Sequence, residues 1–280
     1  MQIGEITTSA SNRVKFLTVL STNKNFTLLF LLFISSLGHA CTGEDRHFID
    51  EYKIELRAKH AGQSLDFDRI SPESKNWPAR QGLIILVVPY LFDANPENKR
   101  FLGLGIAIAQ PSSGRNLSKY DQSPISTVDA IFPIAVRIDT AFYKLNSDQV
   151  AFGLVIDQRN SSGVNPFAEE MESLYVQDGG KINNILDGMV IYRSSGEGDG
   201  DCAFEAKRKT SILSMLSSNS NGYHDINVNQ ETEIIKNYIH GKSCRATTNA
   251  LDSRSYRLRF RNKRYEIPSD LVSGSLTTPR

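Results

Sequence analysis

The sequence has almost no net charge. Its 280 residues include 32 lysines and arginines and 31 aspartates and glutamates, which gives a formal net charge of +1. Nucleic-acid-binding domains concentrate basic charge, and a balanced chain creates no such long-range field. We therefore expect no nucleic-acid partner. Intrinsic disorder is also unexpected, because 40% of the residues are hydrophobic and can supply a sizeable core.

Cysteine is scarce, and the usual metal and catalytic motifs are missing. The cysteines are Cys41, Cys202 and Cys244, and no two of them have C-x-x-C spacing. The histidines after residue 40 show no H-x-x-x-H spacing. The sequence also lacks G-x-S-x-G, H-E-x-x-H and P-loop motifs. These absences leave an enzyme assignment without a motif to support it.

The longest apolar run is too short to cross a membrane. Phe26 to Gly38 spans 13 residues, whereas a membrane helix needs about 20. Lys15 and Lys24 precede the run, and the small-residue stretch Gly38-His-Ala-Cys41 follows it. This order is typical of a secretory signal peptide that is removed. We therefore predict that residues 1–40 direct export to the periplasm or the medium.

Export leaves a chain of moderate length. Removal of residues 1–40 leaves 240 residues, enough for one large domain or two small ones. We predict β-rich domains over 41–165 and 166–280, with one continuous domain as the alternative.

Export also governs how the cysteines are interpreted. In an oxidising compartment, Cys202 and Cys244 are expected to be joined. Their bridge would close a loop of about 40 residues and stabilise the fold by roughly 3–4 kcal/mol. Cys41, just after the predicted cleavage site, has no partner in this scheme. It is a possible lipid attachment site, and only lipidation would make the membrane a partner.

Short apolar and β-branched runs separated by turn residues predict a mainly β fold of antiparallel sheets and hairpins. Turns recur about every 10–15 residues, which favours antiparallel sheet over βαβ units. Apolar residues at helical spacing indicate one short helix near 45–60, and the Ser-rich stretch 111–124 is expected to be a polar loop. The expected strands are 82–88, 102–109, 130–138, 150–156, 173–177, 189–193, 203–216 and 225–229, with a hairpin over 256–267 that turns near Asn262-Lys263. Gly103 and Gly105 lie within one of these runs and are expected to permit close packing.

Several stretches from Val150 onward carry a resemblance. They include Asn165-Pro-Phe-Ala-Glu-Glu170, Ile185-Leu-Asp-Gly188, Gly196-Glu-Gly-Asp-Gly-Asp-Cys202 and Gly222-Tyr-His-Asp225. With these motifs the chain resembles a group of uncharacterised exported bacterial proteins that have a β-rich C-terminal half. The group's pattern has Trp where this chain has Gly198. The resemblance implies a β-rich envelope protein with a Cys202–Cys244 disulfide, and it brings no activity to transfer.

Glu197, Asp199 and Asp201 alternate with glycines and form one candidate site. In an extended stretch their carboxylates would share a face, and a Ca²⁺ ion could offset their repulsion. The EF-hand pattern fails, because the twelfth position from Glu197 is Arg208. The alternative is a solvated acidic turn before a strand.

A second candidate is a group of arginines near the C-terminus. Arg257, Arg259, Arg261 and Arg264, together with Lys207-Arg208-Lys209, could bind anions such as lipopolysaccharide phosphates or an acidic protein. The alternative is the outer face of a strand that charge keeps soluble.

For function, the sequence favours a non-catalytic binding or interaction protein of the cell envelope, with an unknown envelope component or protein as its partner. A hydrolase of envelope polymers is the first alternative, with Glu169, Glu170 or His224 as the candidate catalysts and Glu172 as a further acid. His224 and Asp225 are adjacent in an expected strand and would point to opposite sides, which does not suit a relay. A structural lipoprotein anchored through Cys41 is the second alternative.

Overall fold

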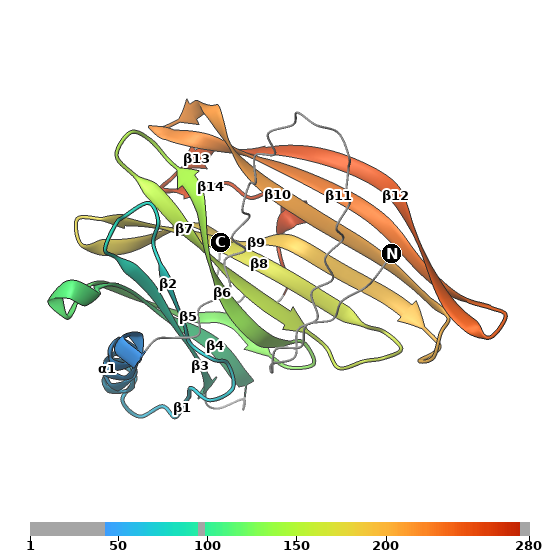
Figure 1. Ribbon diagram of the computed structural model, residues 1–280, viewed down its shortest axis with the longest axis horizontal. Helices are drawn as coiled ribbons and strands as arrows, with labels where there is room; N and C mark the ends of the chain where they lie inside the picture. Colours follow the sequence, from blue (N-terminus) through green and yellow to red (C-terminus); the bar gives the residue numbers. More distant parts are fainter. Residues whose placement is uncertain (1–42, 95–98, 275–280) are drawn as a thin grey trace, which may run out of the picture. The chain divides into compact units, whose positions relative to one another are not determined.

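The computed structural model describes residues 43–94 and 99–274. These residues form antiparallel sheets, with one α-helix at the start of the first range (Figure 1). The predicted mainly β, antiparallel class with a short N-terminal helix is confirmed. The predicted signal peptide and Cys41 lie outside the described residues.

Helix α1 (Gly43–Lys59) lies against the first sheet, sheet A (Figure 1). The strands of sheet A are β1 (Leu65–Asp66), β2 (Glu73–Asn76), β3 (Ile84–Ala94), β4 (Lys99–Gln110) and β5 (Arg115–Val128), in the order β1-β3-β4-β5 with β2 also paired to β3. The helix buries Phe48, Ile49, Tyr52 and Leu56. These are the residues whose spacing predicted it, and they form one apolar stripe.

Two glycines of β4 permit the close packing that the sequence predicts. A Cβ atom on Gly105 would lie 2.6 Å from Leu56 Cδ1 of the helix. A Cβ atom on Gly103 would lie 2.4 Å from the ring of Tyr90. Side chains at these two positions would therefore collide with the helix and with the aromatic cluster beneath it.

The prediction of a polar loop over 111–124 is wrong for most of its length. Only the turn at 111–114 precedes β5, which pairs with β4 from Arg115 onward. β5 is an edge strand of sheet A, so much of it remains partly exposed and can be polar. Pro124 falls between the paired residues Gln122 and Ser126, where the ladder is irregular and does not need its N–H.

The second sheet, sheet B, is a meander of seven strands paired in chain order. They are β6 (Phe132–Lys144), β7 (Val150–Arg159), β8 (Phe167–Asp178), β9 (Lys181–Gly198), β10 (Phe204–Ser220), β11 (Tyr223–His240) and β12 (Ser243–Leu258). β7 pairs with β8 along its length, so the domain boundary suggested near 165 falls between two paired strands. We therefore favour the alternative of one continuous domain over the described residues.

Sheets A and B share the largest apolar core. Leu104 and Ile106 of sheet A pack with Phe152 and Tyr175 of sheet B, and Trp77 meets Phe152 edge-on at 5.3 Å between ring centroids. This core uses the face of sheet A opposite α1. The two faces of one sheet are therefore covered by different partners, which explains the nearly continuous apolar run in β3 and β4.

A further core lies on the other face of β6–β9. Ends of β11 and β12 contribute Ile226, Val228 and Leu258, and the C-terminal segment contributes Tyr265 and Leu271. That segment consists of β13 (Phe260–Arg261), β14 (Arg264–Tyr265) and the 3₁₀ helix η2 (Ser269–Leu271).

The predicted C-terminal hairpin is correct in its turn but too long in its strands. Asn262 and Lys263 both have positive φ, 49° and 68°, as a two-residue hairpin turn requires. β13 and β14 share only two pairs, because β12 up to Leu258 pairs with β11 instead.

Candidate functional site

The four C-terminal arginines mostly face acids of their own chain. Arg257 Nε donates to Asp225 at 2.9 Å, Arg264 lies 3.7 Å from Asp187, and Arg261 lies 3.6 Å from Glu266. Within the described ranges, Arg259 has no ion pair. The cationic group is therefore largely neutralised where it stands, and its binding of anions remains a prediction.

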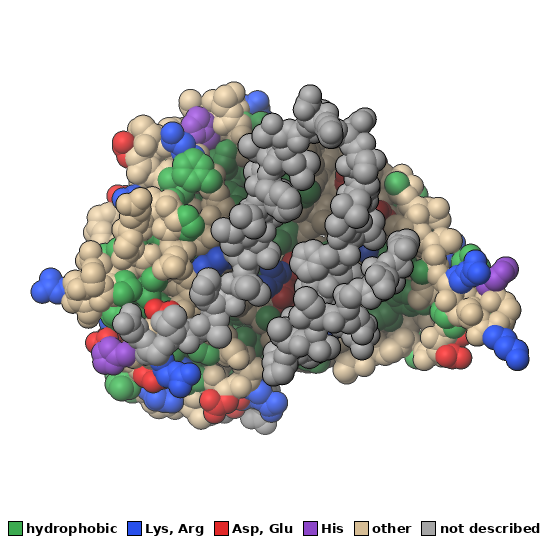
Figure 2. Space-filling model, in the orientation of Figure 1, with side chains coloured by type: hydrophobic (Ala, Val, Ile, Leu, Met, Phe, Trp, Pro, Cys, Tyr) green, Lys and Arg blue, Asp and Glu red, His purple; other side chains and the backbone are tan. Residues whose placement is uncertain are grey.

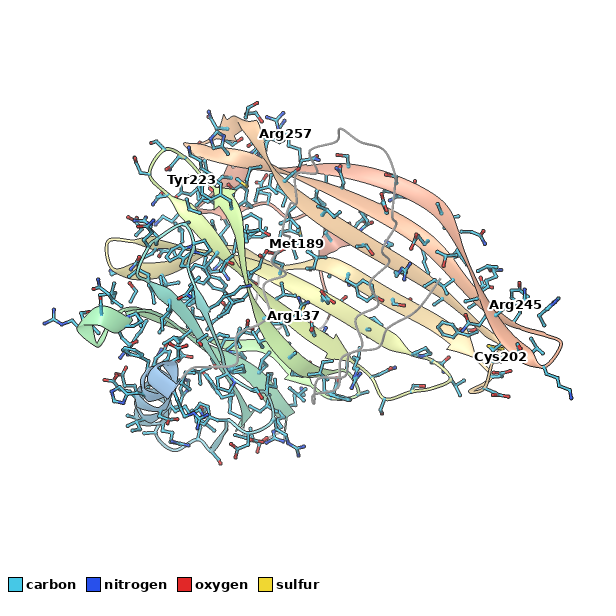
Figure 3. All side chains as sticks on the ribbon, in the orientation of Figure 1. Arg137, Met189, Cys202, Tyr223, Arg245 and Arg257 are labelled. Atoms are coloured by element: carbon cyan, nitrogen blue, oxygen red, sulfur yellow. A yellow bond between two sulfur atoms is a disulfide. The ribbon has the colours of Figure 1, made fainter. Side chains whose placement is uncertain are left out.

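The C-terminal arginines and the group Lys207-Arg208-Lys209, which were predicted to act together, are far apart. Arg257 is paired in register with Asn227, whereas Lys207 is paired with Ile234, seven residues farther along β11. At about 3.3 Å per residue this is roughly 23 Å along the strand. Figure 3 places Arg257 and Arg245 at different ends of sheet B. One continuous cationic face is therefore not formed.

Asp225 is the buried member of the Arg257 pair. It is 0% exposed and also accepts a hydrogen bond from Ser218 at 2.9 Å. Burial favours the neutral acid, but hydrogen bonds from Ser220, Arg257 and Ser218 outweigh it and hold the pKa of Asp225 below its ordinary value. Arg257 thus compensates a charge inside the protein.

The acidic stretch after β9 forms a turn. The Asp199 N–H donates to the Ala203 carbonyl at 3.0 Å, and the Asp201 N–H donates to Asp199 Oδ1 at 2.8 Å. Across 43–94 and 99–274, no group of three or more His, Cys, Asp or Glu side chains is arranged to hold a metal. Calcium binding by Glu197, Asp199 and Asp201 remains a prediction.

The candidate catalysts lie in polar networks on sheet B. Glu169 is 2% exposed, and it accepts hydrogen bonds from Gln158 at 2.9 Å and from Arg193 and Ser273. Glu170 accepts from Arg137 at 2.7 Å on the opposite face. His224 and Asp225 share no hydrogen bond in the described part of the chain. These contacts hold the acids in place but bring no two of the proposed catalysts together.

Glu172 shares a hydrogen-bonding partner with a second carboxylate, that of Asp139, which was not among the candidate residues predicted from the sequence. The Tyr143 hydroxyl lies 2.6 Å from Asp139 Oδ2 and 2.9 Å from Glu172 Oε1. Burial, followed by the charge of Asp139, raises the pKa of Glu172 to about 8. Glu172 is 2% exposed, so at neutral pH it is a protonated acid beneath the surface.

Helix α1 is tied to the edge of sheet A by another polar cluster. Asp121 lies 2.7 Å from His60 Nε2 and 2.8 Å from Lys59 Nζ, and it accepts a hydrogen bond from the Tyr90 hydroxyl. Tyr52 donates to the Tyr120 carbonyl at 2.8 Å. The adjoining cavity measures about 180 Å³, below the range of about 300–1,000 Å³ usual for small-molecule sites. We interpret this cluster as an anchor for the helix.

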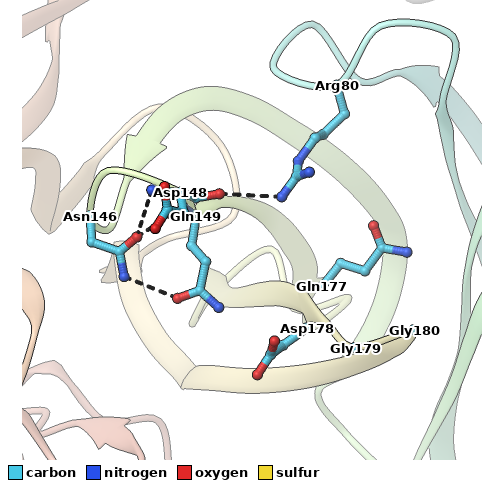
Figure 4. A pocket seen from close by; sticks show the side chains of 8 residues that line it. All are labelled: Arg80, Asn146, Asp148, Gln149, Gln177, Asp178, Gly179 and Gly180. Atoms are coloured by element: carbon cyan, nitrogen blue, oxygen red, sulfur yellow. Dashed lines mark hydrogen bonds between the residues drawn. The ribbon is translucent and has the colours of Figure 1, made fainter.

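A large polar hollow lies where three loops meet (Figure 4). It measures about 530 Å³ and is lined by Arg80, Asn146, Asp148, Gln149, Gln177 and Asp178, together with the turn at 179–180. The loops are those between β2 and β3, between β6 and β7, and between β8 and β9. Every side chain lining this hollow is polar, so it is a candidate binding surface for a small polar molecule.

The end of sheet B near residue 244 is shaped by its cysteines. Cys202 and Cys244 lie at disulfide distance, with Cα atoms 5.7 Å apart, as the sequence predicts. Cys202 precedes β10, and Cys244 begins β12, opposite Ile239 of β11. The bridge therefore crosses the end of β11 and holds three strands together.

Reduction of this bridge is expected to loosen the end of β12. In the chain-entropy model, the loop between Cys202 and Cys244 accounts for roughly 3–4 kcal/mol. We expect the Cys202→Ser, Cys244→Ser variant to have a lower free energy of unfolding by about that amount and faster amide exchange over 243–250. Urea unfolding with hydrogen exchange measures both. If exchange in β12 is unchanged while the core exchanges faster, the bridge does not hold this edge.

β12 is one edge strand of sheet B, and among the residues that the structure describes no strand pairs with its outer side. All residues from 243 to 255 are exposed, so both faces and one side of the strand are accessible. Its centre, 246–251, is uncharged, with Ala, Thr, Asn and Leu side chains. We call residues 243–255 the β12 edge. Natural edges are usually shorter or guarded by charge at their centre.

Basic charge and apolar side chains surround the β12 edge. Residues 234–255 include four lysines and arginines and one aspartate. Figure 2 shows basic side chains and a histidine gathered at this end of the molecule, which Figure 3 marks with Arg245. Ile239 and Leu251 are 64% and 58% exposed. The edge thus offers unpaired backbone groups, positive charge and apolar area together.

No family model, curated protein or solved structure matches this chain. No helix in the described ranges is long and apolar enough to cross a membrane. Function is therefore inferred from the chemistry and geometry of the described residues.

Proposed function

We propose that the protein is a non-catalytic interaction module of the cell envelope, whose β12 edge adds an extended, acidic segment of a partner protein as a further strand. The observation that carries this proposal is the run of exposed residues from 243 to 255 on a strand that, within the described ranges, is paired on one side only. Strand addition uses backbone hydrogen bonds for affinity and alternate side chains for specificity.

The charge around the edge selects the class of partner. Four basic residues against one acidic residue over 234–255 favour a segment rich in Asp or Glu, because complementary charge guides encounter and fixes register. Lys236 is paired with Glu205 at 2.8 Å and Arg254 with Asp252 at 2.8 Å. Within the described residues, Lys242 and Arg245 have no acidic partner and are free to meet the incoming segment.

The hydrolase alternative is weaker, because its candidate acids are buried or already paired. Glu169 and Glu172 are both 2% exposed, and Glu170 is held by Arg137. A general acid must come within hydrogen-bond reach of its substrate, and neither buried glutamate lines the large hollow. The lipoprotein alternative depends on Cys41, and mass spectrometry of the mature N-terminus tests it.

Site-specific photo-cross-linking tests the proposal. p-Benzoylphenylalanine is introduced at Thr248, in the centre of the β12 edge, and the protein is expressed in the cells that produce it. The control carries the same group at Ile54, which is 65% exposed on α1. We expect a protein adduct from position 248 alone, with an acidic segment at the attachment point. An adduct only with a second copy, an adduct with lipopolysaccharide, or no adduct would each contradict it.

A further inference from the structure

The large polar hollow carries a second inference, independent of the β12 edge. Its volume of about 530 Å³ falls within the range of about 300–1,000 Å³ typical of small-molecule sites. The three loops that build it approach from both sheets. Such a loop cluster on a rigid scaffold is a common location for binding residues.

The lining excludes two classes of ligand. No aliphatic or aromatic side chain lines the hollow, so an apolar molecule would gain little by entering it. Its charged groups are Arg80 against Asp148 and Asp178, a net charge of −1. That balance disfavours an anion, because like charges repel more strongly where water is partly displaced.

The polar groups are held in fixed orientations. Asn146 Oδ1 accepts the N–H groups of Asp148 and Gln149, both at 2.9 Å, and Asn146 Nδ2 donates to Gln149 Oε1 at 3.1 Å (Figure 4). Gln177 Nε2 donates to Ser118 at 2.7 Å, which leaves the Gln177 carbonyl oxygen as an acceptor. Preorganised groups of this kind bind at a lower entropic cost.

Arg80 and Asp178 provide further hydrogen-bonding groups in the hollow. Arg80 Nη2 donates to the Asp148 carbonyl at 3.4 Å, and its guanidinium lies 5.9 Å from the centroid of the Trp77 ring. The remaining N–H groups of the fork are available as donors. Asp178 is exposed at the end of β8 and offers two acceptor oxygens. The hollow therefore contains both donors and acceptors, and a hydroxyl group, which is both donor and acceptor, can satisfy such a mixture.

We propose that this hollow binds a neutral saccharide, with Arg80, Gln177 and Asp178 forming hydrogen bonds to its hydroxyl groups. The ligand class follows from the net charge, the absence of apolar lining and the fixed mixture of donors and acceptors. The site would give the protein a second attachment point, to a glycan, at a place separate from the β12 edge.

Saturation-transfer NMR on the purified protein tests this site. The probes are maltose, cellobiose and N,N′-diacetylchitobiose at millimolar concentration, with glucuronate and citrate as anionic comparisons. We expect signal transfer to at least one neutral disaccharide and weaker transfer to both anions. Preferential binding of an anion, or no transfer to any neutral probe, would overturn the proposal.

Two substitutions locate the binding. Asp178→Ala and Gln177→Ala are each expected to weaken binding by about tenfold, the equivalent of one good hydrogen bond to a charged or fixed polar group. Asp50→Ala, which removes an exposed acid on α1, is the matched control and should leave affinity unchanged. Equal affinity in all three variants would place the saccharide elsewhere and refute the assignment.

Discussion

Replacing Glu172 with glutamine is expected to stabilise the protein at pH 8 and to remove much of its pH dependence between pH 5 and 8. The pKa of Glu172 is raised from 4.5 to about 8, so the folded state keeps a proton that the unfolded state has released. Stability from this group is complete below about pH 4.5 and is lost as the pH rises towards 8. At about 1.4 kcal/mol per tenfold change in proton affinity, we expect wild-type protein to lose about 3 kcal/mol over this interval.

Urea unfolding at pH 5, 6, 7 and 8 measures this difference. Glutamine resembles the protonated acid and keeps a donor beside Asp139 and Tyr143, so the fold should be retained. Glu170→Gln is the control, because Glu170 is on the same strand but is paired with Arg137 near the surface. If the Glu172 variant shows the wild-type slope, or is less stable than wild type at pH 8, Glu172 is not protonated in the folded protein.

The second large effect concerns Arg257. The substitution Arg257→Ala leaves the carboxylate of Asp225, which is 0% exposed, without its guanidinium partner. Breaking a buried pair by removing one partner typically costs about 3–5 kcal/mol. Arg257 itself is 46% exposed, and water can reach part of the space it leaves, so we expect about 2–3 kcal/mol by urea unfolding.

Arg259→Ala is the matched control for this prediction. Arg259 is exposed two residues farther along and has no ion pair within the described residues, so its loss should change stability by less than about 0.5 kcal/mol. Adding Asp225→Asn to Arg257→Ala should restore part of the lost stability, because it removes the uncompensated charge. Equal losses for Arg257→Ala and Arg259→Ala would show that the Arg257–Asp225 ion pair does not stabilise the fold.

Sequence alone could predict the features that depend on neighbours in the chain. The helix follows from the spacing of Phe48, Ile49, Tyr52 and Leu56. The hairpin turn follows from the position of Asn262-Lys263 between the two apolar runs, and asparagine tolerates the positive φ that the turn requires. The disulfide follows from counting the cysteines together with the predicted export to an oxidising compartment. Each of these requires no knowledge of strand register.

Features that depend on register could not be predicted. Glu172 of β8 meets Asp139 of β6 across β7. Asp139 is paired in register with Gly153 of β7, and a Cβ atom on Gly153 would lie 2.6 Å from Glu172 Oε1. Arg257 and Asp225 lie 32 residues apart and meet only through the pairing of β11 with β12. A shift of one residue would turn these side chains to opposite faces, and composition does not specify that shift.

Strand β5 and the hollow were missed for related reasons. β5 is polar because it is an edge strand, and edge strands lack the apolar alternation on which strand prediction depends. The hollow combines Arg80, Gln149 and Gln177 from three loops, none of which contains a motif. Gln177 is the penultimate residue of β8 and Gln149 directly precedes β7, a pattern too common in surface turns to indicate a site.

The β12 edge is the feature on which the proposed function depends. Along an antiparallel strand, N–H groups point alternately towards the paired strand and away from it. One of Thr247 and Thr248 therefore directs its N–H to β11 and the other to the free side. Proline is tolerated in an edge strand only where the N–H is not needed by the sheet.

The most direct test of the proposed function measures how these two proline variants bind the partner. A synthetic peptide with the sequence of the segment cross-linked at position 248 is titrated against wild type, Thr247→Pro and Thr248→Pro by calorimetry, and amide exchange of β11 reports folding. We predict that one variant keeps β11 protected yet binds the peptide at least about tenfold more weakly. If both proline variants keep β11 protected and bind the peptide with wild-type affinity, strand addition at the β12 edge is contradicted.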